Sequence, residues 1–229
     1  MVGAILVLSG AGLSAESGLK TFRAEDGLWE NYRVEDVATP EAFARDPALV
    51  QRFYNERRAD VAVARPNPAH EALARLQQAH GESVHLVTQN IDDLLERGGA
   101  RDVFHMHGEV NSALCAACGH RWPAPDVMEA GHPCPACGAP AARPDIVWFG
   151  EMPYHMDRIQ AALEASDLFV ALGTSGTVYP AAGFRQMAQQ LGIRTMEINL
   201  DASGALFDEV REGPASTVVP EWVSEVLNG

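Results

Sequence analysis

The sequence predicts an α/β protein in which a parallel sheet is covered by helices on both faces and carries one small inserted module. Three observations predict this. Short apolar runs rich in β-branched residues recur, helical patterns lie between many of them, and a cysteine-rich segment interrupts the alternation. Strands that are apolar on both faces and alternate with helices are typical of a buried parallel sheet. A chain of 229 residues, 47% of them hydrophobic, can bury such a core and still carry an insert.

The expected strands are the apolar runs. In chain order they are Ala4–Leu8, Val84–Val87, Val103–Met106, Ile146–Phe149, Leu168–Leu172 and Thr195–Leu200. In an open parallel sheet, ligands bind beyond the carboxyl ends of the strands. Polar residues that directly follow these runs are therefore candidates for a site.

The expected helices follow from apolar spacing and end signals. A long helical pattern over 40–65 is divided at Pro47, and another begins at Pro68 after Asn67 and ends at Gly81. Two more are expected at Met156–Ala165 and Ala181–Leu191.

The charge of the chain narrows the class of partner. The sequence has 17 basic and 31 acidic residues, a net charge of −14. An acidic surface repels phosphate backbones, so we expect no nucleic-acid partner, and a lysine-bearing peptide suits the surface better.

No run approaches the ~20 apolar residues that span a bilayer, so we expect no membrane partner. The apolar segment 1–10 lacks a basic region, so we interpret it as a strand and not a secretion signal and expect a cytoplasmic protein. A monomer is the expected state, although the sequence contains no signal for it.

The four cysteines of the chain form two C-x-x-C pairs. They are Cys115 with Cys118 and Cys134 with Cys137, with fifteen residues between the pairs, in a segment rich in Gly, Pro and Ala. Two such pairs supply the four thiolates of a closed tetrahedral Zn²⁺ site, which leaves no open position for catalysis. Disulfides are the alternative, and the missing secretion signal disfavours them. The pattern predicts a structural zinc-ribbon module.

A glycine-rich loop follows the first expected strand. It runs from Gly10 through Gly12 and Ser14 to Gly18, and glycines here allow backbone N–H groups to approach phosphates. A hydride-transfer enzyme would continue with a helix, a second strand and an acidic residue for the ribose. This chain continues with the loop-like segment 20–29, and residues suited to ribose come only at 199–201. We therefore expect a dinucleotide site with an unusual lid in a Rossmann-like sheet.

In order and over nearly the whole chain, these residues resemble the sirtuin family. The motifs that carry the resemblance are Gly10-Ala11-Gly12-x-Ser14-x-Glu16-Ser17-Gly18, Phe22-Arg23, Asp26-Gly27-Leu28-Trp29, Thr88-Gln89-Asn90-Ile91-Asp92, His107-Gly108, the cysteine pairs, Val147-x-Phe149-Gly150-Glu151, Gly173-Thr174-Ser175 and Asn199-Leu200-Asp201. The variant is similar to the bacterial and mitochondrial class that removes acidic acyl groups.

The resemblance implies an NAD-dependent protein-lysine deacylase. Residues 1–110 and 145–229 would form the NAD-binding domain, with a helical lid at about 20–66, and 111–144 the zinc module. The acyl-lysine oxygen would attack the nicotinamide ribose as nicotinamide leaves, and the acyl group would end on ADP-ribose. The cofactor contacts implied are Gly10, Ala11, Gly12, Ser14, Glu16, Phe22, Arg23, Trp29, Gln89, Asn90, Ile91, Asp92, Gly173, Thr174, Ser175, Asn199, Leu200, Asp201 and Ala215.

The catalytic residues implied are His107, Asn90 and Asp92. A histidine near pKa ~6.5 suits proton transfer at neutral pH, so His107 would be the general base. The pattern alone leaves His105 and His107 open, because two positions apart in a strand face the same side. The resemblance selects His107.

A substrate pocket is expected from a second group of residues. Tyr54 and Arg57 are three apart and share a helix face, where a guanidinium and a phenol can hold the carboxylate of succinyl- or malonyl-lysine. Ala38 is the small neighbour that the resemblance implies. The alternative is that Arg57 and Arg58 belong to a solvated face. The backbone of Val147, Phe149, Gly150 and Glu151 would take an extended acyl-lysine peptide.

Three alternative functions are compatible with parts of the sequence. NAD-dependent protein ADP-ribosyl transfer uses the same nicotinamide cleavage, and its product distinguishes it. A non-catalytic reader of acyl-lysine or NAD is disfavoured by the presence of Asn90, Asp92 and His107 together. A zinc-ribbon nucleic-acid binder is disfavoured by the net charge and by an insert whose basic residues are Arg121 and Arg143.

Overall fold

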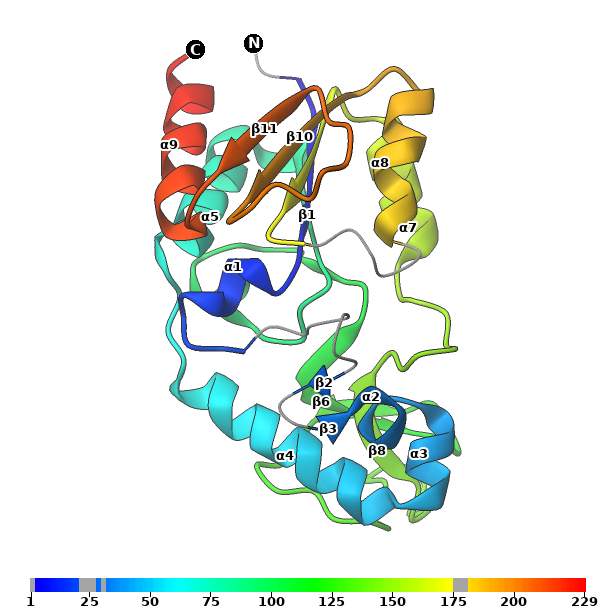
Figure 1. Ribbon diagram of the computed structural model, residues 1–229. Coiled ribbons are helices and arrows are strands. Elements are labelled where there is room, and N and C mark those ends of the chain that lie inside the picture. Colours follow the sequence, from blue (N-terminus) through cyan, green and yellow to red (C-terminus); the bar gives the residue numbers. More distant parts are fainter. Residues whose placement is uncertain (1–2, 21–27, 30–31, 175–180) are drawn as a thin grey trace.

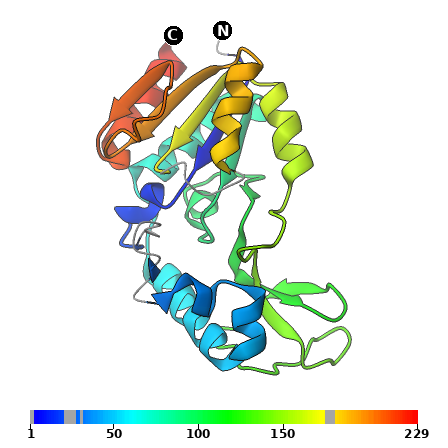
Figure 2. The same cartoon turned by 45° about the vertical axis from the view of Figure 1, so that its right-hand side comes forward.

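The protein has two lobes, one large and one small (Figures 1 and 2). The computed structural model describes residues 3–20, 28–29, 32–174 and 181–229. In these residues the large lobe holds a six-stranded sheet and the small lobe a three-stranded sheet with helices against it. No helix in the described part of the chain is both long and apolar enough to cross a membrane.

The six-stranded sheet is parallel throughout, in the order β11-β10-β9-β1-β4-β5. Its strands are β1 (Ile5–Ser9), β4 (Val84–Thr88), β5 (Phe104–His105), β9 (Leu168–Leu172), β10 (Arg194–Asn199) and β11 (Glu209–Glu212). The chain adds strands first on the β4 side of β1 and then on the β9 side. The order therefore reverses beside β1, and a crevice for ligands is expected at the carboxyl ends there.

Helices cover both faces of this sheet, as the sequence predicts. On one face lie α5 (Pro68–His80) and α9 (Ala215–Asn228), and on the other lie α7 (Met156–Glu164) and α8 (Ala181–Gln190). Alternate residues of β1 enter the two cores: Val7 packs in the first and Leu8 in the second. This alternation explains why β1 is buried along its whole length.

The small lobe has its own core. Its antiparallel sheet has the order β7-β6-β8, from β6 (Gly108–Cys115), β7 (Arg121–Pro123) and β8 (Ala142–Ile146). The helices α2 (Val34–Val37), α3 (Pro40–Arg45) and α4 (Pro47–Val63) pack against it through a cluster that includes Phe53 and Trp148.

Short elements complete the described chain: α1 (Gly12–Ala15), β2 (Leu28–Trp29), β3 (Tyr32–Arg33), a 3₁₀ turn (Gly81–Ser83) and α6 (Leu94–Arg97).

Polar side chains of α4 join this helix to the cysteine-rich insert. Gln51 Nε2 donates to the Ala142 carbonyl at 3.0 Å, and the Asn55 amide pairs with both backbone groups of Met128 at 3.0 Å. Arg58 Nε donates to the Val110 carbonyl at 3.1 Å. The helices of the segment 20–66, which was expected to form a lid, thus pack into the small lobe. The division of the chain into domains at residues 110 and 145 stays a prediction.

Several element boundaries are confirmed and two are wrong. The break at Pro47 is present, with the Asp46 carboxylate accepting from Leu49 N at 2.9 Å, and α5 begins at Pro68 behind its Asn67 cap. The run expected as a strand at 146–149 is wrong, because β8 lies earlier and ends at Ile146. The run expected at 103–106 shortens to β5, because the chain turns after His105.

Candidate active site and metal centre

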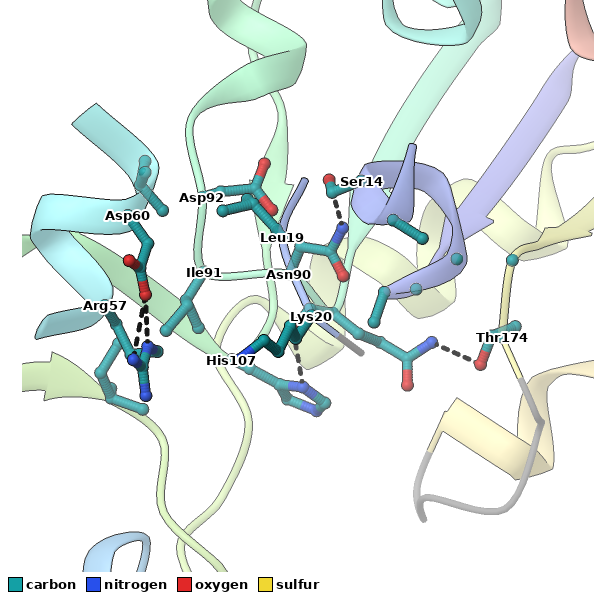
Figure 3. Close-up of a pocket in the computed structure, with 18 of the residues that line it drawn as sticks. Ser14, Leu19, Lys20, Arg57, Asp60, Asn90, Ile91, Asp92, His107 and Thr174 are labelled. Carbon is teal, nitrogen blue, oxygen red and sulfur yellow. Dashed lines mark hydrogen bonds and ion pairs between the residues drawn. The ribbon is translucent and has the colours of Figure 1, made fainter. Parts of the chain in front are cut away.

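A pocket of about 720 Å³ lies at the carboxyl ends of the parallel strands, between the two lobes. Loops that follow β1, β4, β9 and β10 line it, together with residues of α4 and of the segment after β8. Figure 3 shows Arg57 and Asp60 on one side of the pocket and Thr174 on the other. Of the residues predicted to bind cofactor or substrate, the following line it: Gly10, Ala11, Gly12, Ser14, Glu16, Ala38, Tyr54, Arg57, Gln89, Asn90, Ile91, Asp92, His107, Val147, Phe149, Gly150, Glu151, Gly173, Thr174, Asn199, Leu200 and Ala215.

The glycine loop is packed tightly against the end of β9. Gly12 N donates to the Gly173 carbonyl at 2.8 Å, and a Cβ on Gly12 would lie 2.7 Å from Gly173 Cα. A Cβ on Gly10 would lie 2.8 Å from Thr174 Cβ. Glycine is therefore required at both positions for the loop to follow this path. Beside it, Gln89 Nε2 donates to Thr174 Oγ1 at 3.0 Å, so the ends of β4 and β9 are linked at the pocket floor.

A buried hydrogen-bond network centred on Ser14 orders the Asn90 and Asp92 side chains. His70 Nδ1 accepts from Asn67 N at 3.2 Å, so the neutral ring carries its hydrogen on Nε2 and donates to Ser14 Oγ at 3.3 Å. Asn90 Nδ2 also donates to Ser14 Oγ, at 3.1 Å, and the Ser14 hydroxyl bonds to the Asp92 carboxylate. Sequence reasoning missed His70, whose position on an ordinary helix gives no signal of this role.

Burial governs the ionisation of this network. It lowers the pKa of His70 to about 4, against a smaller effect of the hydrogen bond from Asn67. Burial also raises the pKa of Asp92, with bonds from Leu94 N and Ser14 acting the other way. His70 is consequently neutral at physiological pH, in the protonation state that its two hydrogen bonds require.

The structure distinguishes the two histidines that the pattern leaves open. His107 lies in the turn after β5 and lines the pocket, where its Nδ1 donates to the Gln89 carbonyl at 3.1 Å. That bond leaves the lone pair on Nε2, and burial lowers the pKa of His107, so the ring is a neutral base at pH 7. His105 is outside the pocket lining and bonds Glu96 at 2.8 Å. Burial lowers the pKa of His105, but the Glu96 carboxylate outweighs it and the net direction is upward.

The α4 end of the pocket carries a phenol and an ion pair. Tyr54 is fully buried and accepts a hydrogen bond from Trp148 Nε1 at 3.0 Å, and burial raises the pKa of its hydroxyl. The Arg57 side chain is 13% exposed and pairs with Asp60, with Nη2 at 2.9 Å from the carboxylate. Arg58 is 5% exposed. The interpretation of both arginines as a solvated face is therefore wrong.

The segment expected to take a peptide is fixed by bonds within the chain. Val147 N donates to the His107 carbonyl at 2.9 Å, and Phe149 N donates to the Ala38 carbonyl at 3.0 Å. The Glu151 carboxylate accepts from Trp148 N at 2.8 Å and from both terminal nitrogens of Arg143, at 2.7 and 2.9 Å. The side chain of Glu151 thus has a structural role, while Phe149 is exposed at the pocket edge.

Other predicted residues lie elsewhere. Phe22, Arg23 and Ser175 are outside the described residues, and Trp29 is described only as backbone of β2. Asp201 is exposed and is not part of the pocket lining. The Glu16 carboxylate accepts from Ser216 N at 2.8 Å and Ser216 Oγ at 2.6 Å, so it caps the start of α9. Lining residues that sequence reasoning did not assign are Ala15, Gly18, Leu19, Lys20, Asp60, Val61, Ile146, Trp148, Pro153, Ile198, Gly213 and Pro214.

The four cysteines converge in the small lobe, where Cys115 is the last residue of β6. Their sulfur atoms all lie within 4.8 Å of one another, with Cys115 Sγ 3.7 Å from Cys137 Sγ and Cys118 Sγ 3.8 Å from Cys134 Sγ. These separations exceed the ~2.05 Å of a disulfide and match the edges of a ZnS₄ tetrahedron with ~2.3 Å bonds.

The two cysteine turns repeat one geometry. Gly119 N donates to the Cys115 carbonyl and Gly138 N to the Cys134 carbonyl, both at 2.9 Å. The two glycines have φ of +74° and +72°, which side chains rarely adopt. The donor set and the spacing fit a structural Zn²⁺ and leave no open ligand position.

Known proteins resemble this chain over almost its whole length. The Sir2 family model matches residues 10–180. The chain is 53% identical over 229 residues to an NAD-dependent protein deacylase of Caulobacter vibrioides, covering 97% of this chain and 96% of that protein. It is 55% identical over 232 residues to an NAD-dependent protein deacylase of Salmonella typhimurium, covering 98% and 84%.

Solved structures of Sir2 proteins are also similar to this chain. A mutant Sir2 homologue in complex with ADP ribose has a TM-score of 0.90 at 38% identity, covering 98% of this chain and 92% of that one. A Sir2 homologue–NAD complex has a TM-score of 0.88 at 39% identity, covering 98% and 89%. A complex of Sir2 with a p53 peptide and NAD⁺ has a TM-score of 0.77 at 26% identity, covering 98% and 92%. The chain therefore belongs to the Sir2 family.

Proposed function

We propose that this protein removes acyl groups from protein lysine side chains with NAD as co-substrate, and that it acts on acetyl, succinyl and malonyl groups. The products are nicotinamide, O-acyl-ADP-ribose and free lysine. One observation carries the proposal: a single pocket contains the glycine loop, a neutral histidine and a tyrosine–arginine pair. The NAD-dependent deacylases to which the chain is similar support the reaction type.

The cofactor end is assigned to the loops that follow β1, β4, β9 and β10. NAD supplies a ribose that accepts the acyl group as nicotinamide leaves. The backbone of the loop at Gly10–Gly12 would hold the phosphates, and Gln89 and Thr174, which line the same pocket, would hold the ribose. Asn90 and Asp92, ordered through Ser14, hold the nicotinamide end.

His107 is assigned as the general base. Its Nδ1 hydrogen is held by the Gln89 carbonyl, which points the Nε2 lone pair away from that bond. Burial keeps the ring neutral, so Nε2 can take a proton from a ribose hydroxyl at pH 7. The fixed tautomer makes Nε2 the nitrogen that can accept the proton.

The acyl end is assigned to Tyr54, Arg57 and Ala38. The buried Tyr54 hydroxyl accepts a hydrogen bond from Trp148 Nε1 and lines the pocket one helical turn before Arg57. Arg57 Nη1 is buried and has no hydrogen-bond partner among the described residues. A carboxylate at the end of a succinyl group would satisfy it with a charge-assisted bond.

The test uses matched peptides. Purified protein is incubated with NAD and acetyl-, succinyl- or malonyl-lysine peptides, and peptide mass and nicotinamide release are followed. We expect one nicotinamide per acyl group removed and none without NAD. Deacylation without NAD would refute the proposal, and ADP-ribosylated protein in place of O-acyl-ADP-ribose would show a transferase.

The acyl assignment has a test of its own. A hydrogen bond to a charged group contributes ~1.5–3 kcal/mol, so Arg57→Met should lower the ratio of desuccinylation to deacetylation kcat/KM about ten- to a hundredfold. Tyr54→Phe should change the ratio in the same direction and by less, because only one hydroxyl is lost. An unchanged ratio in Arg57→Met would show that Arg57 does not read the acyl group.

A further inference from the structure

Arg57 meets a carboxylate of the protein before any substrate arrives. Its Nε lies 3.0 Å and its Nη2 2.9 Å from the same oxygen of Asp60, one helical turn further along α4. Both residues line the pocket, and Figure 3 shows the pair at the side of the pocket opposite Thr174, with His107 between them. One of the two edges with which a guanidinium grips a carboxylate is therefore occupied by Asp60.

The remaining edge is the one left for a substrate. Arg57 Nη1 is buried without a hydrogen-bond partner among the described residues, although the Asp60 side chain itself is 51% exposed. Glu56 is more distant, with its carboxylate 3.9 Å from Nη2, and it is not part of the pocket lining. Asp60 is thus the carboxylate that shares Arg57 with an incoming acyl group.

A pocket that binds both acidic and uncharged acyl groups needs a second negative charge near Arg57 when the acyl group carries none. A short uncharged acyl group offers Arg57 no negative charge, and a largely buried cation without a partner is unfavourable. Asp60 supplies the missing charge when acetyl-lysine is bound. When succinyl-lysine is bound, the same carboxylate repels the acyl carboxylate and competes for Arg57.

We propose that Asp60 is a specificity-determining residue that restrains the preference for acidic acyl groups, so that the pocket also accepts uncharged ones. The proposal rests on the assignment of Arg57 as the reader of the acyl carboxylate. Asp60 acts through Arg57 and takes no part in the chemical step.

The test compares selectivity in variants of the full chain. The readout is kcat/KM for succinyl-lysine peptide divided by that for acetyl-lysine peptide. Because partly exposed ion pairs contribute ~0.2–1 kcal/mol, Asp60→Asn should raise this ratio about 1.4- to fivefold. Glu56→Gln removes the same charge from the same helix and should raise it less. Thermal unfolding checks that each variant is folded, and Asp60→Ser should repeat the direction of change.

Two further arms separate charge from space and the inference from its basis. A peptide carrying the monoamide of succinyl-lysine has the same length without the charge, and Asp60→Asn should not improve its turnover relative to acetyl. In an Arg57→Met background, Asp60→Asn should have no effect on the ratio. An unchanged or lower ratio in Asp60→Asn, or an equal gain with the monoamide, overturns the inference. If Arg57→Met alone leaves the ratio unchanged, the acyl assignment fails first, and the two failures are told apart.

Discussion

His70 makes the stability of this protein depend on pH in a way that can be calculated. Burial lowers its pKa from 6.5 to about 4 in the folded protein. The folded state therefore binds fewer protons than the unfolded chain between these pH values, and unfolding takes up a proton. The contribution of His70 to the free energy of unfolding is fully present above pH 6.5 and is lost as pH falls toward 4.

The magnitude follows from the shift. One pKa unit corresponds to ~1.36 kcal/mol, so a shift of about 2.5 units amounts to about 3 kcal/mol. His70→Gln retains a polar side chain that does not titrate. The free energy of unfolding of the variant should be lower at pH 7, because the buried hydrogen bonds of His70 are lost or distorted. It should, however, fall less steeply than that of the wild type as pH decreases.

The assay is chemical denaturation of wild type and variant at several pH values between 7 and 4.5, in the same zinc concentration. The measured quantity is the difference between their free energies of unfolding, since acid release of zinc affects both proteins. That difference should shrink as pH falls. Gln78→Asn, which changes an exposed side chain of the same helix that does not titrate, is the control and should keep the wild-type slope. A difference that is constant with pH would refute the reasoning.

Three other predictions address the metal, the base and the cofactor. Purified protein should contain about one Zn²⁺ per chain, and Cys118→Ser should lower thermal stability and activity together; full stability in a verified zinc-free preparation would exclude a structural role. His107→Ala should lower kcat/KM ~10²–10⁴-fold with the fold intact by circular dichroism, and His105→Ala less, so the opposite order would contradict the assignment. Because burial lowers the pKa of His107, activity should decline only below pH 6.5, and a decline centred above that value in a pH profile would count against it as the base. Asn90→Ala should impair turnover of acetyl and succinyl peptides to the same degree, and an effect confined to one peptide would place Asn90 at the acyl end.

Local sequence signals predicted the elements whose stability is mostly local. The strand Leu168–Leu172 matches its apolar run, and α5 begins and ends at its Asn–Pro and glycine signals. The strand β8 was missed because it contains Arg143 and Asp145, which look like loop residues. Their partners, Glu151 and Arg121, become visible only when the chain has folded.

The site shows the same division. The cysteine pairs and the glycine loop depend on short spacing, and in the structure the four cysteines lie together and the loop lines the pocket. The choice between His105 and His107 could not be made from periodicity, because the chain leaves the strand between them. Asp60 and His70 have helical positions typical of solvent-facing residues, and only the tertiary structure reveals what each one contacts.

The hydrogen bonds between α4 and the cysteine-rich insert connect the metal site to a helix that carries none of its ligands. Asn55 and Arg58 hold the insert, while Tyr54 and Arg57, on neighbouring positions of the same helix, line the pocket. A shift of the insert on metal loss would turn or displace this helix and move the pocket wall that Tyr54 and Arg57 form. Enzyme only partly loaded with zinc would then behave as a mixture of two forms that differ in the shape of this pocket wall.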